Sequence, residues 1–319
     1  MRILDVSNSS ERPRHRGHGG LLENSVVTML KKHAKEYEAE FVSFPEQADI
    51  IFTNDVYPAW VDNFNLPRVK RMDGVFWQKK NIERNISLNA AAEKSDYVIF
   101  ISEFSKNQYE ELYNPLNVPN KVILNWVDTN YFYPSEEPIQ ENIVITTASS
   151  WKREEKRFSS ILYLAHHFKD LQFIFIGKPE TKYVLERNLV FTGEIKEPQE
   201  LASILRRGKG FINLSYRDAA PKVIPEAMCC GLSVFFSFSG GTKEFYPAGQ
   251  TIQDPIKEKF EEKTPELSLT NLENTFCKFL FQLDKNYQYT RKNFKVYQRR
   301  KETLLKNYFD VFSNLKESR

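Results

Sequence analysis

Apolar positions in the first half of the chain fall into short β-rich runs that alternate with segments of helical spacing. Runs rich in Val, Ile and Phe predict strands at residues 2–6, 41–44, 50–53, 68–72, 97–101 and 121–124. Apolar residues three or four positions apart predict helices over residues 21–30, 82–94 and 102–113. Strands that alternate with helices in this way predict a parallel sheet with helices packed on it.

The alternation stops at residues 130–141 and then begins again. This break contains two prolines and few apolar residues, so we place a domain boundary there. Strands are predicted again at residues 142–146, 171–176, 210–214 and 233–236, and helices at 158–167, 198–206 and 223–230. The sequence therefore predicts an α/β fold of two tandem Rossmann-like domains, residues 1–135 and 136–285. Such sheets bind ligands beyond the carboxyl ends of their strands, which predicts a cleft between the domains.

The C-terminal segment, residues 286–319, has a different pattern. Apolar residues follow one face at three-to-four spacing, and the other faces are basic and polar. This pattern predicts one long amphipathic helix whose apolar stripe must pack on another part of the protein. The stripe consists of Phe294, Tyr297, Leu304, Tyr308, Val311 and Leu315.

Composition narrows the class of protein. The 319 residues are 41% hydrophobic and 27% charged, as in folded globular chains. No apolar run approaches the ~18 residues that a membrane-spanning helix needs. The first residues are typical of a strand and lack the longer apolar core of a signal peptide. Three cysteines, two of them adjacent, make no disulfide framework, so we expect a cytoplasmic protein.

The formal net charge of +3 conceals an asymmetry. Residues 285–319 hold ten Lys or Arg and three acidic residues, a charge of +7, so the rest of the chain carries −4. An acidic body with a basic tail does not fit a general polyanion binder, and the one-sided aromatic stripe favours packing over base stacking. We therefore expect no nucleic-acid partner. Peripheral contact of the basic face with an anionic membrane stays an alternative.

The strongest chemical signal lies at a predicted strand–loop–helix junction, where Asp218 and Glu226 stand eight positions apart. Pro221 suits the first helical turn, where its missing N–H costs nothing. The helix start and Lys222 together form a candidate site for an anion such as a diphosphate. Glu226, one turn into the helix, suits a diol such as a ribose. The structural alternative is that Asp218 caps the helix and Glu226 is a solvated helix residue.

A second candidate is the loop over residues 146–158, which follows the first strand of the second domain. Four cations are interleaved there with two acids. The loop lies at the same edge of the predicted sheet as Asp218, where a basic loop suits a diphosphate group. The alternative is that these charges form a solvated helix start.

In combination, these segments resemble nucleotide-sugar glycosyltransferases of the GT-B architecture, and most of all the retaining glycosyltransferase family 4. Asp218 and Glu226, with the Ala-Met-x-x-Gly-Leu-Ser-Val run after them, resemble the family's acid-x7-acid element. Residues 238–244 resemble its Gly-Gly-Thr-x-Glu loop, and residues 125–134 its Asn-Gly-Val-Asp interdomain segment. Residues 101–106, 175–177 and 191–193 also fit. The match covers most of residues 70–245.

The resemblance implies roles for individual residues. Lys156 would bind the diphosphate of a nucleotide-sugar donor, Glu226 its ribose and Asp218 the donor sugar. The arginine that accompanies the lysine in the family falls at Trp151 or Lys152, and both alternatives stay open.

Glycines and the last helix also have counterparts in the family. The loop after Gly193 would lie near the nucleotide base. Gly19 and Gly20 resemble the glycine loop that approaches the donor phosphates and the acceptor. The family's last helix crosses back to the first domain, and this would give the apolar stripe of residues 286–319 a surface to pack on.

Three departures from the family pattern concern the reacting centre. Asp218 replaces a commoner glutamate, Ala-Ala-Pro-Lys replaces a commoner Pro-Phe-Gly loop, and the frequent histidine of the first domain has no clear counterpart. Residues 71–77 stand in its place, so Asp73 is our candidate for the polar group nearest the reacting centre. The alternative is that Asp73 and Gly74 are an ordinary turn pair.

The expected reaction needs neither a metal nor another cofactor, since the sequence has no metal-ligand cluster and no Asp-x-Asp motif. Lys156 and Lys222 would neutralise the leaving diphosphate. We expect transfer of a sugar from a UDP- or GDP-linked donor to a hydroxyl of a glycan or lipid-linked acceptor, with retention. The alternatives are a sugar-nucleotide epimerase of the same architecture and a non-catalytic protein that binds anionic surfaces.

Overall fold

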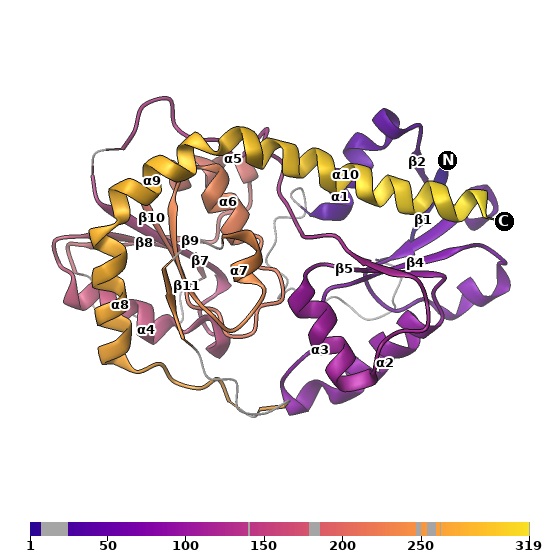
Figure 1. Cartoon of the computed structure of the whole chain (residues 1–319), viewed down its shortest axis with the longest axis horizontal. Coiled ribbons are helices and arrows are strands. Elements are labelled where there is room, and N and C mark those ends of the chain that lie inside the picture. The colour runs from indigo at the N-terminus through magenta and orange to yellow at the C-terminus, as the bar shows by residue number, and fades with distance from the viewer. Residues whose placement is uncertain are drawn as a thin grey trace.

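Two parallel six-stranded sheets lie side by side in the computed structural model and form the cores of two domains (Figure 1). The structure describes residues 1–7, 25–139, 141–178, 186–246, 250–253, 260–261 and 263–318. The strand order is β2-β1-β3-β4-β5-β6 in the N-terminal domain and β12-β11-β10-β7-β8-β9 in the C-terminal domain. In parallel sheets the carboxyl ends of all strands lie at one edge. The predicted α/β fold of two Rossmann-like domains is confirmed.

The N-terminal sheet consists of β1 (Arg2–Asp5), β2 (Glu40–Val42), β3 (Ile50–Thr53), β4 (Arg68–Met72), β5 (Tyr97–Phe100) and β6 (Asn120–Val122). Its helices are α1 (Val26–His33), α2 (Ile82–Glu93) and α3 (Glu103–Tyr113). Strand β3 buries all four of its residues, because helices cover both faces of a parallel sheet. The predicted helix over residues 21–30 begins at Val26, after Ser25 accepts a capping hydrogen bond from the Thr28 amide; residues 21–24 lie outside the described residues.

The C-terminal sheet consists of β7 (Ile143–Ser150), β8 (Gln172–Lys178), β9 (Leu189–Gly193), β10 (Gly210–Asn213), β11 (Ser233–Ser237) and β12 (Gln250–Ile252). Its helices are α4 (Phe158–His167), α5 (Pro198–Leu205), α6 (Val223–Cys229) and α7 (Thr242–Phe245). The sequence pattern predicted neither β9 nor β12. Both are edge strands: the apolar run of β9 is only three residues long, Leu189 to Phe191, and β12 begins with Gln and Thr.

The C-terminal segment crosses from one domain to the other (Figure 1). It contains α8 (Leu269–Phe281), α9 (Leu283–Lys292) and α10 (Phe294–Glu317). The single helix predicted over residues 286–319 is therefore wrong in its extent, because two helices meet at Asn293. The side-chain amide of Asn293 donates to the Tyr289 carbonyl oxygen (2.8 Å), and such local bonds compete with the helical pattern.

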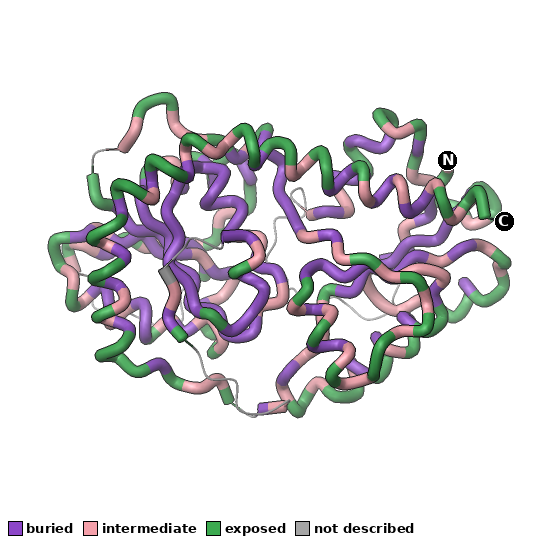
Figure 2. Tube along the Cα trace, in the orientation of Figure 1, coloured by how far each residue is buried: buried purple, intermediate pink, exposed green. Residues whose placement is uncertain are grey.

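The apolar face of α10 packs on the N-terminal domain. Phe309 stacks on Tyr37 with ring centroids 4.5 Å apart, and Phe312 meets Phe52 edge-on at 5.6 Å. Buried and exposed positions alternate along this helix (Figure 2). In the described ranges no helix combines the length and the apolar composition needed to cross a membrane.

The segment between the sheets is held by one buried carboxylate, Asp128. It accepts hydrogen bonds from the Asn130 amide (3.0 Å) and from Nζ of Lys32 in α1 (2.9 Å), and Nζ of Lys301 in α10 lies 3.5 Å away. Burial opposes its ionisation, yet these partners hold the pKa of Asp128 below its ordinary value. The connection between the domains is thereby fixed to α1 and α10.

Loss of the α10 packing should destabilise the whole chain. The Phe312 side chain is fully buried, so Phe312→Ala should cost about 3–5 kcal/mol, measured as a lower midpoint of chemical denaturation. Val296→Ala on the exposed face of the same helix is the matched control and should change the free energy of unfolding by less than about 0.5 kcal/mol. Equal effects of the two substitutions would contradict the packing role of α10.

Candidate active site

Three loops meet at the carboxyl edge of the C-terminal sheet. They follow β7, β10 and β11, which are neighbours in the order β11-β10-β7. The amide of Tyr216 donates to the carbonyl oxygen of Glu155 (2.8 Å), and the amide of Gly241 donates to the carbonyl oxygen of Asp218 (3.0 Å). These bonds join the loop of residues 215–219 to the loops on both sides of it.

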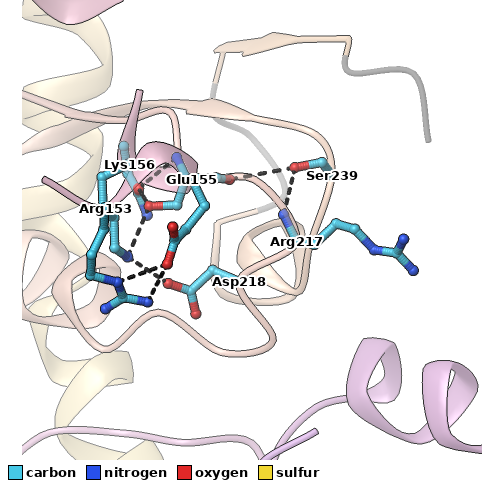
Figure 3. Close-up of polar contacts among 8 residues, drawn as sticks. Arg153, Glu155, Lys156, Arg217, Asp218 and Ser239 are labelled. Atoms are coloured by element: carbon cyan, nitrogen blue, oxygen red, sulfur yellow. Dashed lines mark hydrogen bonds and ion pairs between the residues drawn. The ribbon is translucent and has the colours of Figure 1, made fainter. Parts of the chain in front are cut away.

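Lys156 and Asp218, which the sequence places 62 residues apart, form an ion pair in the structure (Nζ–Oδ2 3.0 Å). The same Nζ donates to Oγ of Ser215 (3.1 Å), and Arg153 lies beside it in a pair with Glu155 (Nε–Oε1 2.7 Å), as Figure 3 shows. The side chains of Lys156 and Asp218 are 11% and 28% exposed. The pair is therefore accessible to a ligand while its surroundings strengthen electrostatic interactions.

Two glycines allow the β11 loop to approach Asp218. A Cβ at Gly240 would lie 2.3 Å from the carbonyl oxygen of Asp218, and a Cβ at Gly241 would lie 2.0 Å from that of Ala219. Both distances are shorter than any real Cβ contact, so only glycine fits at these positions. The Gly-Gly pair found in the sequence thus supports the loop that carries Asp218.

Glu226 and Lys222 lie beside each other at the beginning of α6. Glu226 is buried, and Lys222 is partly buried. Burial lowers the pKa of the Lys222 ammonium to about 8, the Glu226 carboxylate opposes this shift, and the positive charge of Arg71 in the N-terminal domain adds to it. Lys222 and Arg71, cations from the two domains, therefore lie close enough to repel each other, an arrangement that favours an anion between them.

Asp73 comes from the N-terminal domain, directly after β4. Its partly exposed carboxylate pairs with Arg71 (Nη1–Oδ1 2.5 Å). The next residue, Gly74, has a φ of 109°, and a Cβ there would lie 3.1 Å from Cβ of Ala219. Gly74 therefore has a backbone conformation that favours glycine, and it lies against the residue that follows Asp218; whether Asp73 acts at the reacting centre stays a prediction.

The two positions considered for the accompanying arginine differ in environment. Trp151 is 2% exposed, and its ring packs against Phe158 and Phe175 at 5.4 and 5.7 Å. Lys152 is exposed. Trp151 is therefore a core residue of the C-terminal domain. Of the two positions, only Lys152 presents its side chain to solvent.

The predicted glycine positions have mixed outcomes. Gly193 ends β9 with a φ of 76°, and no atom lies within 4 Å of where its Cβ would be, so the space beside it is open. Gly19 and Gly20 lie outside the described residues.

Sequence reasoning did not single out Arg153, Ser215 or Arg71. The carbonyl oxygen of Arg153 accepts from the Lys156 amide (2.9 Å), but in the sequence Arg153 is one of four cations in a loop, with nothing to distinguish it. Ser215 meets Lys156 only through the fold, and Arg71 pairs with Asp73 across one intervening residue. Within the described part of the chain, no three His, Cys, Asp or Glu side chains come together as a metal site, and the absence of a metal from the reaction stays a prediction.

Known proteins resemble this chain in structure and not detectably in sequence. No protein-family model matches the sequence, and no curated protein does. Sucrose-phosphate synthase from Thermosynechococcus elongatus superposes with a TM-score of 0.66 at 17% identity, over 98% of this chain and 82% of that one. Anabaena Alr3699/HepE, solved in complex with UDP-glucose, gives a TM-score of 0.70 at 16% identity, over 98% and 100% of the chains. WaaG, a glycosyltransferase involved in lipopolysaccharide biosynthesis, gives 0.66 at 12% identity, over 98% and 99%. The chain therefore has the GT-B fold.

Removal of the Lys222 charge should stabilise the ligand-free protein. The Lys222 ammonium has a pKa of about 8 in the folded protein and an ordinary value of 10.5. Below pH 8 its charge destabilises the folded protein. Between about pH 8 and 10.5 this cost falls, so the free energy of unfolding rises with pH. Lys222→Met should therefore raise the melting temperature at pH 7, and the gain should shrink across this range. Thermal unfolding between pH 7 and 10.5 measures it, with exposed Lys196→Met as the control. A gain that is constant with pH would contradict the burial of this charge.

Proposed function

We propose that this protein is a glycosyltransferase that moves a sugar from a UDP- or GDP-linked donor to a hydroxyl of a glycan or glycolipid acceptor. The observation that carries the proposal is the ion pair of Lys156 and Asp218, in a loop that the other domain contacts through Ser102. Buried Glu226 lies in α6, the helix that follows this loop. The GT-B fold supports it, since proteins that share the fold include glycosyltransferases and a complex with UDP-glucose.

In this proposal each polar side chain has one task at the donor. Lys156 and Lys222 bind the diphosphate, Glu226 accepts hydrogen bonds from the ribose diol, and Asp218 contacts the donor sugar. Donor binding then replaces the Lys156–Asp218 pair by a lysine–phosphate and a carboxylate–hydroxyl contact, so that neither charge is left without a partner. Arg153, which lies beside Lys156, supplies the further cation that the buried Trp151 does not.

The proposed reaction breaks the bond between the sugar and the diphosphate, and the negative charge that develops on the leaving phosphate is stabilised by Lys156 and Lys222. Asp73 lies at the acceptor side, where its carboxylate can accept a hydrogen bond from the incoming hydroxyl. We propose retention of configuration, with the leaving phosphate taking the acceptor proton, and neither a metal nor a cofactor. Addition of EDTA should accordingly leave the rate unchanged.

Donor binding should depend on Glu226 and Lys156. A thermal-shift screen against UDP, GDP, ADP and their sugars should show stabilisation by one nucleotide class. Glu226→Ala and Lys156→Ala each remove a charge-assisted hydrogen bond and should weaken binding by about 10- to 100-fold. Exposed Glu200→Ala is the matched control and should bind like the unmodified protein. Unchanged binding in both site variants would overturn the site, and the absence of any nucleotide binding would overturn the function.

A lipid-linked acceptor would require contact with a membrane, and the outer face of α9 and α10 has suitable chemistry. Residues 285–301 contain seven Lys or Arg and no acidic residue. Four of these cations are exposed and have no hydrogen-bond or ion-pair partner among the described residues: Lys285, Lys292, Lys295 and Arg299. Tyr289 and Val296, which are 53% and 46% exposed, are interleaved with them. Cations with interleaved apolar side chains suit an anionic lipid surface.

Reversal of this charge should abolish membrane contact. The unmodified protein should sediment with vesicles of anionic phospholipid at low salt and be released at high salt, because the attraction is screened. Lys285→Glu with Lys292→Glu should prevent sedimentation. Lys196→Glu with Lys263→Glu, at exposed positions of the C-terminal domain, is the charge-matched control and should leave it unchanged. Binding that is insensitive to salt, or lost equally in both double variants, would contradict this role of α9 and α10.

A further inference from the structure

Helix α3 of the N-terminal domain holds the loop of the other domain that carries Asp218. At its beginning, Oγ of Ser102 donates to the carbonyl oxygen of Ala219 (2.6 Å). One and a half turns later, the amide oxygen of Gln108, oriented by its partners, accepts from Nε and Nη2 of Arg217 (3.2 and 3.0 Å). Asp218 therefore lies between two residues that are both bonded to α3.

The side chains that form these two contacts are buried. Ser102 is 0% exposed, Gln108 5% and Arg217 8%. Arg217 has a φ of 50°, its amide donates to Oγ of Ser239 (3.0 Å), and its side chain points away from Asp218 (Figure 3). The backbone at Arg217 therefore turns its side chain toward α3 and leaves the Asp218 carboxylate directed at Lys156.

Glu244 of the C-terminal domain adds a second connection to the same helix. Its carboxylate accepts hydrogen bonds from the amides of Glu103 and Phe104 (2.8 and 2.9 Å), the first residues of α3. The first amides of a helix have no partner within it and carry positive partial charge, which suits a carboxylate. Partial burial raises the pKa of Glu244, and the two amide hydrogen bonds oppose this shift.

The helix also has a cap of its own, which satisfies a different amide from the two that donate to Glu244. Ser102 already accepts from the Ser105 amide (2.9 Å), and the Ser105 hydroxyl completes a capping box. The bonds to Glu244, and the bond from Ser102 to Ala219, are therefore additional, and they join two domains. Gly241 is required at the same place, because a Cβ there would lie 3.2 Å from Oγ of Ser102 and 2.0 Å from the Ala219 carbonyl oxygen.

We infer that Ser102, Gln108 and Glu244 form an interdomain latch whose task is to position Asp218 for the donor sugar. The latch is made when the domains are closed and broken when they part, so the Asp218 loop has its working geometry only in the closed state. Ser102, Gln108 and Glu244 are positioning residues, since they act on the Ala219 backbone, the Arg217 side chain and the first amides of α3, and not on the substrate. The role given to Asp218 rests on the proposed function, whereas the existence of the latch does not depend on that function.

The latch predicts that binding of the nucleotide and placement of the sugar depend on different parts of the protein. Lys156, Lys222 and Glu226 belong to the C-terminal domain, so a nucleotide diphosphate can bind whether or not the latch is made. Placement of Asp218 against the sugar requires α3. Loss of the latch should therefore lower kcat much more than it weakens nucleotide binding.

Glu244→Ala in the full chain is the principal test, with Glu244→Gln as the conservative variant, which keeps one acceptor for the α3 amides. Solution X-ray scattering of the ligand-free proteins measures closure, calorimetric titration with UDP or GDP measures nucleotide binding, and transfer kinetics give kcat. Glu244→Ala should increase the radius of gyration and lower kcat about tenfold or more, with nucleotide affinity within about threefold. Glu244→Gln should recover part of kcat.

Two further variants keep the test decisive. Ser102→Ala with Gln108→Ala removes the latch from the side of α3 and should reproduce the effect of Glu244→Ala. Glu110→Ala removes the ion pair to Lys106 within the same helix and should leave scattering and kcat unchanged. Unchanged scattering and kcat in Glu244→Ala, or a loss of nucleotide affinity equal to the loss of kcat, would overturn the latch. If the unmodified protein binds no sugar nucleotide, the proposed function fails, while the scattering comparison still decides whether the latch exists.

Discussion

The hydrogen bonds between α3 and residues 217–219 are the constraint on which the rest of the site depends. The candidate groups lie at the carboxyl edges of both sheets, Asp73 on one side and Lys156, Asp218 and Glu226 on the other. Because Ser102 and Gln108 hold both neighbours of Asp218, the two edges meet at a defined distance, and Gly74 lies against Ala219. The relative position of the two edges is thereby defined by a few polar contacts.

The electrostatics of this interface favour a ligand over the empty protein. Burial lowers the pKa of Lys70 to about 8, as it does for Lys222, and both lie near Arg71. Nζ of Lys70 donates to the carbonyl oxygen of Arg71 (3.0 Å) and is shielded from solvent. Burial therefore makes the charged forms of Lys70 and Lys222 costly, whereas Asp73 raises the pKa of Arg71 although burial opposes this. An anion bound beside Lys222 would offset part of that cost, and shifted pKa values of this kind cluster at functional sites.

The sequence allowed prediction of the parts of this structure that local pattern determines. The buried strands β3, β7 and β11 have apolar runs of the right length, and Lys156, Asp218 and Glu226 could be grouped because each follows or begins an element at one sheet edge. The residues of α3 could not be found in this way. Glu244 lies 140 residues from Phe104, and a serine at a helix cap looks the same whether or not its hydroxyl reaches another domain. Trp151 and the break at Asn293 likewise depend on packing and local bonds that spacing does not reveal.

The segment between the domains connects the position of α10 to the reacting centre. Arg71 pairs with Asp73 and donates to Oδ1 of Asn125 (2.9 Å), while Asp128, three residues further on, is held by Lys32 and Lys301. Because Arg71 and Asp128 are both buried, neither can change partners without exposing or abandoning a charge. The segment over residues 125–130 is therefore fixed to β4 through Asn125 and Arg71, and to α1 and α10 through Asp128. Because the same Arg71 pairs with Asp73, the position of Asp73 is connected through buried charges to the packing of α10.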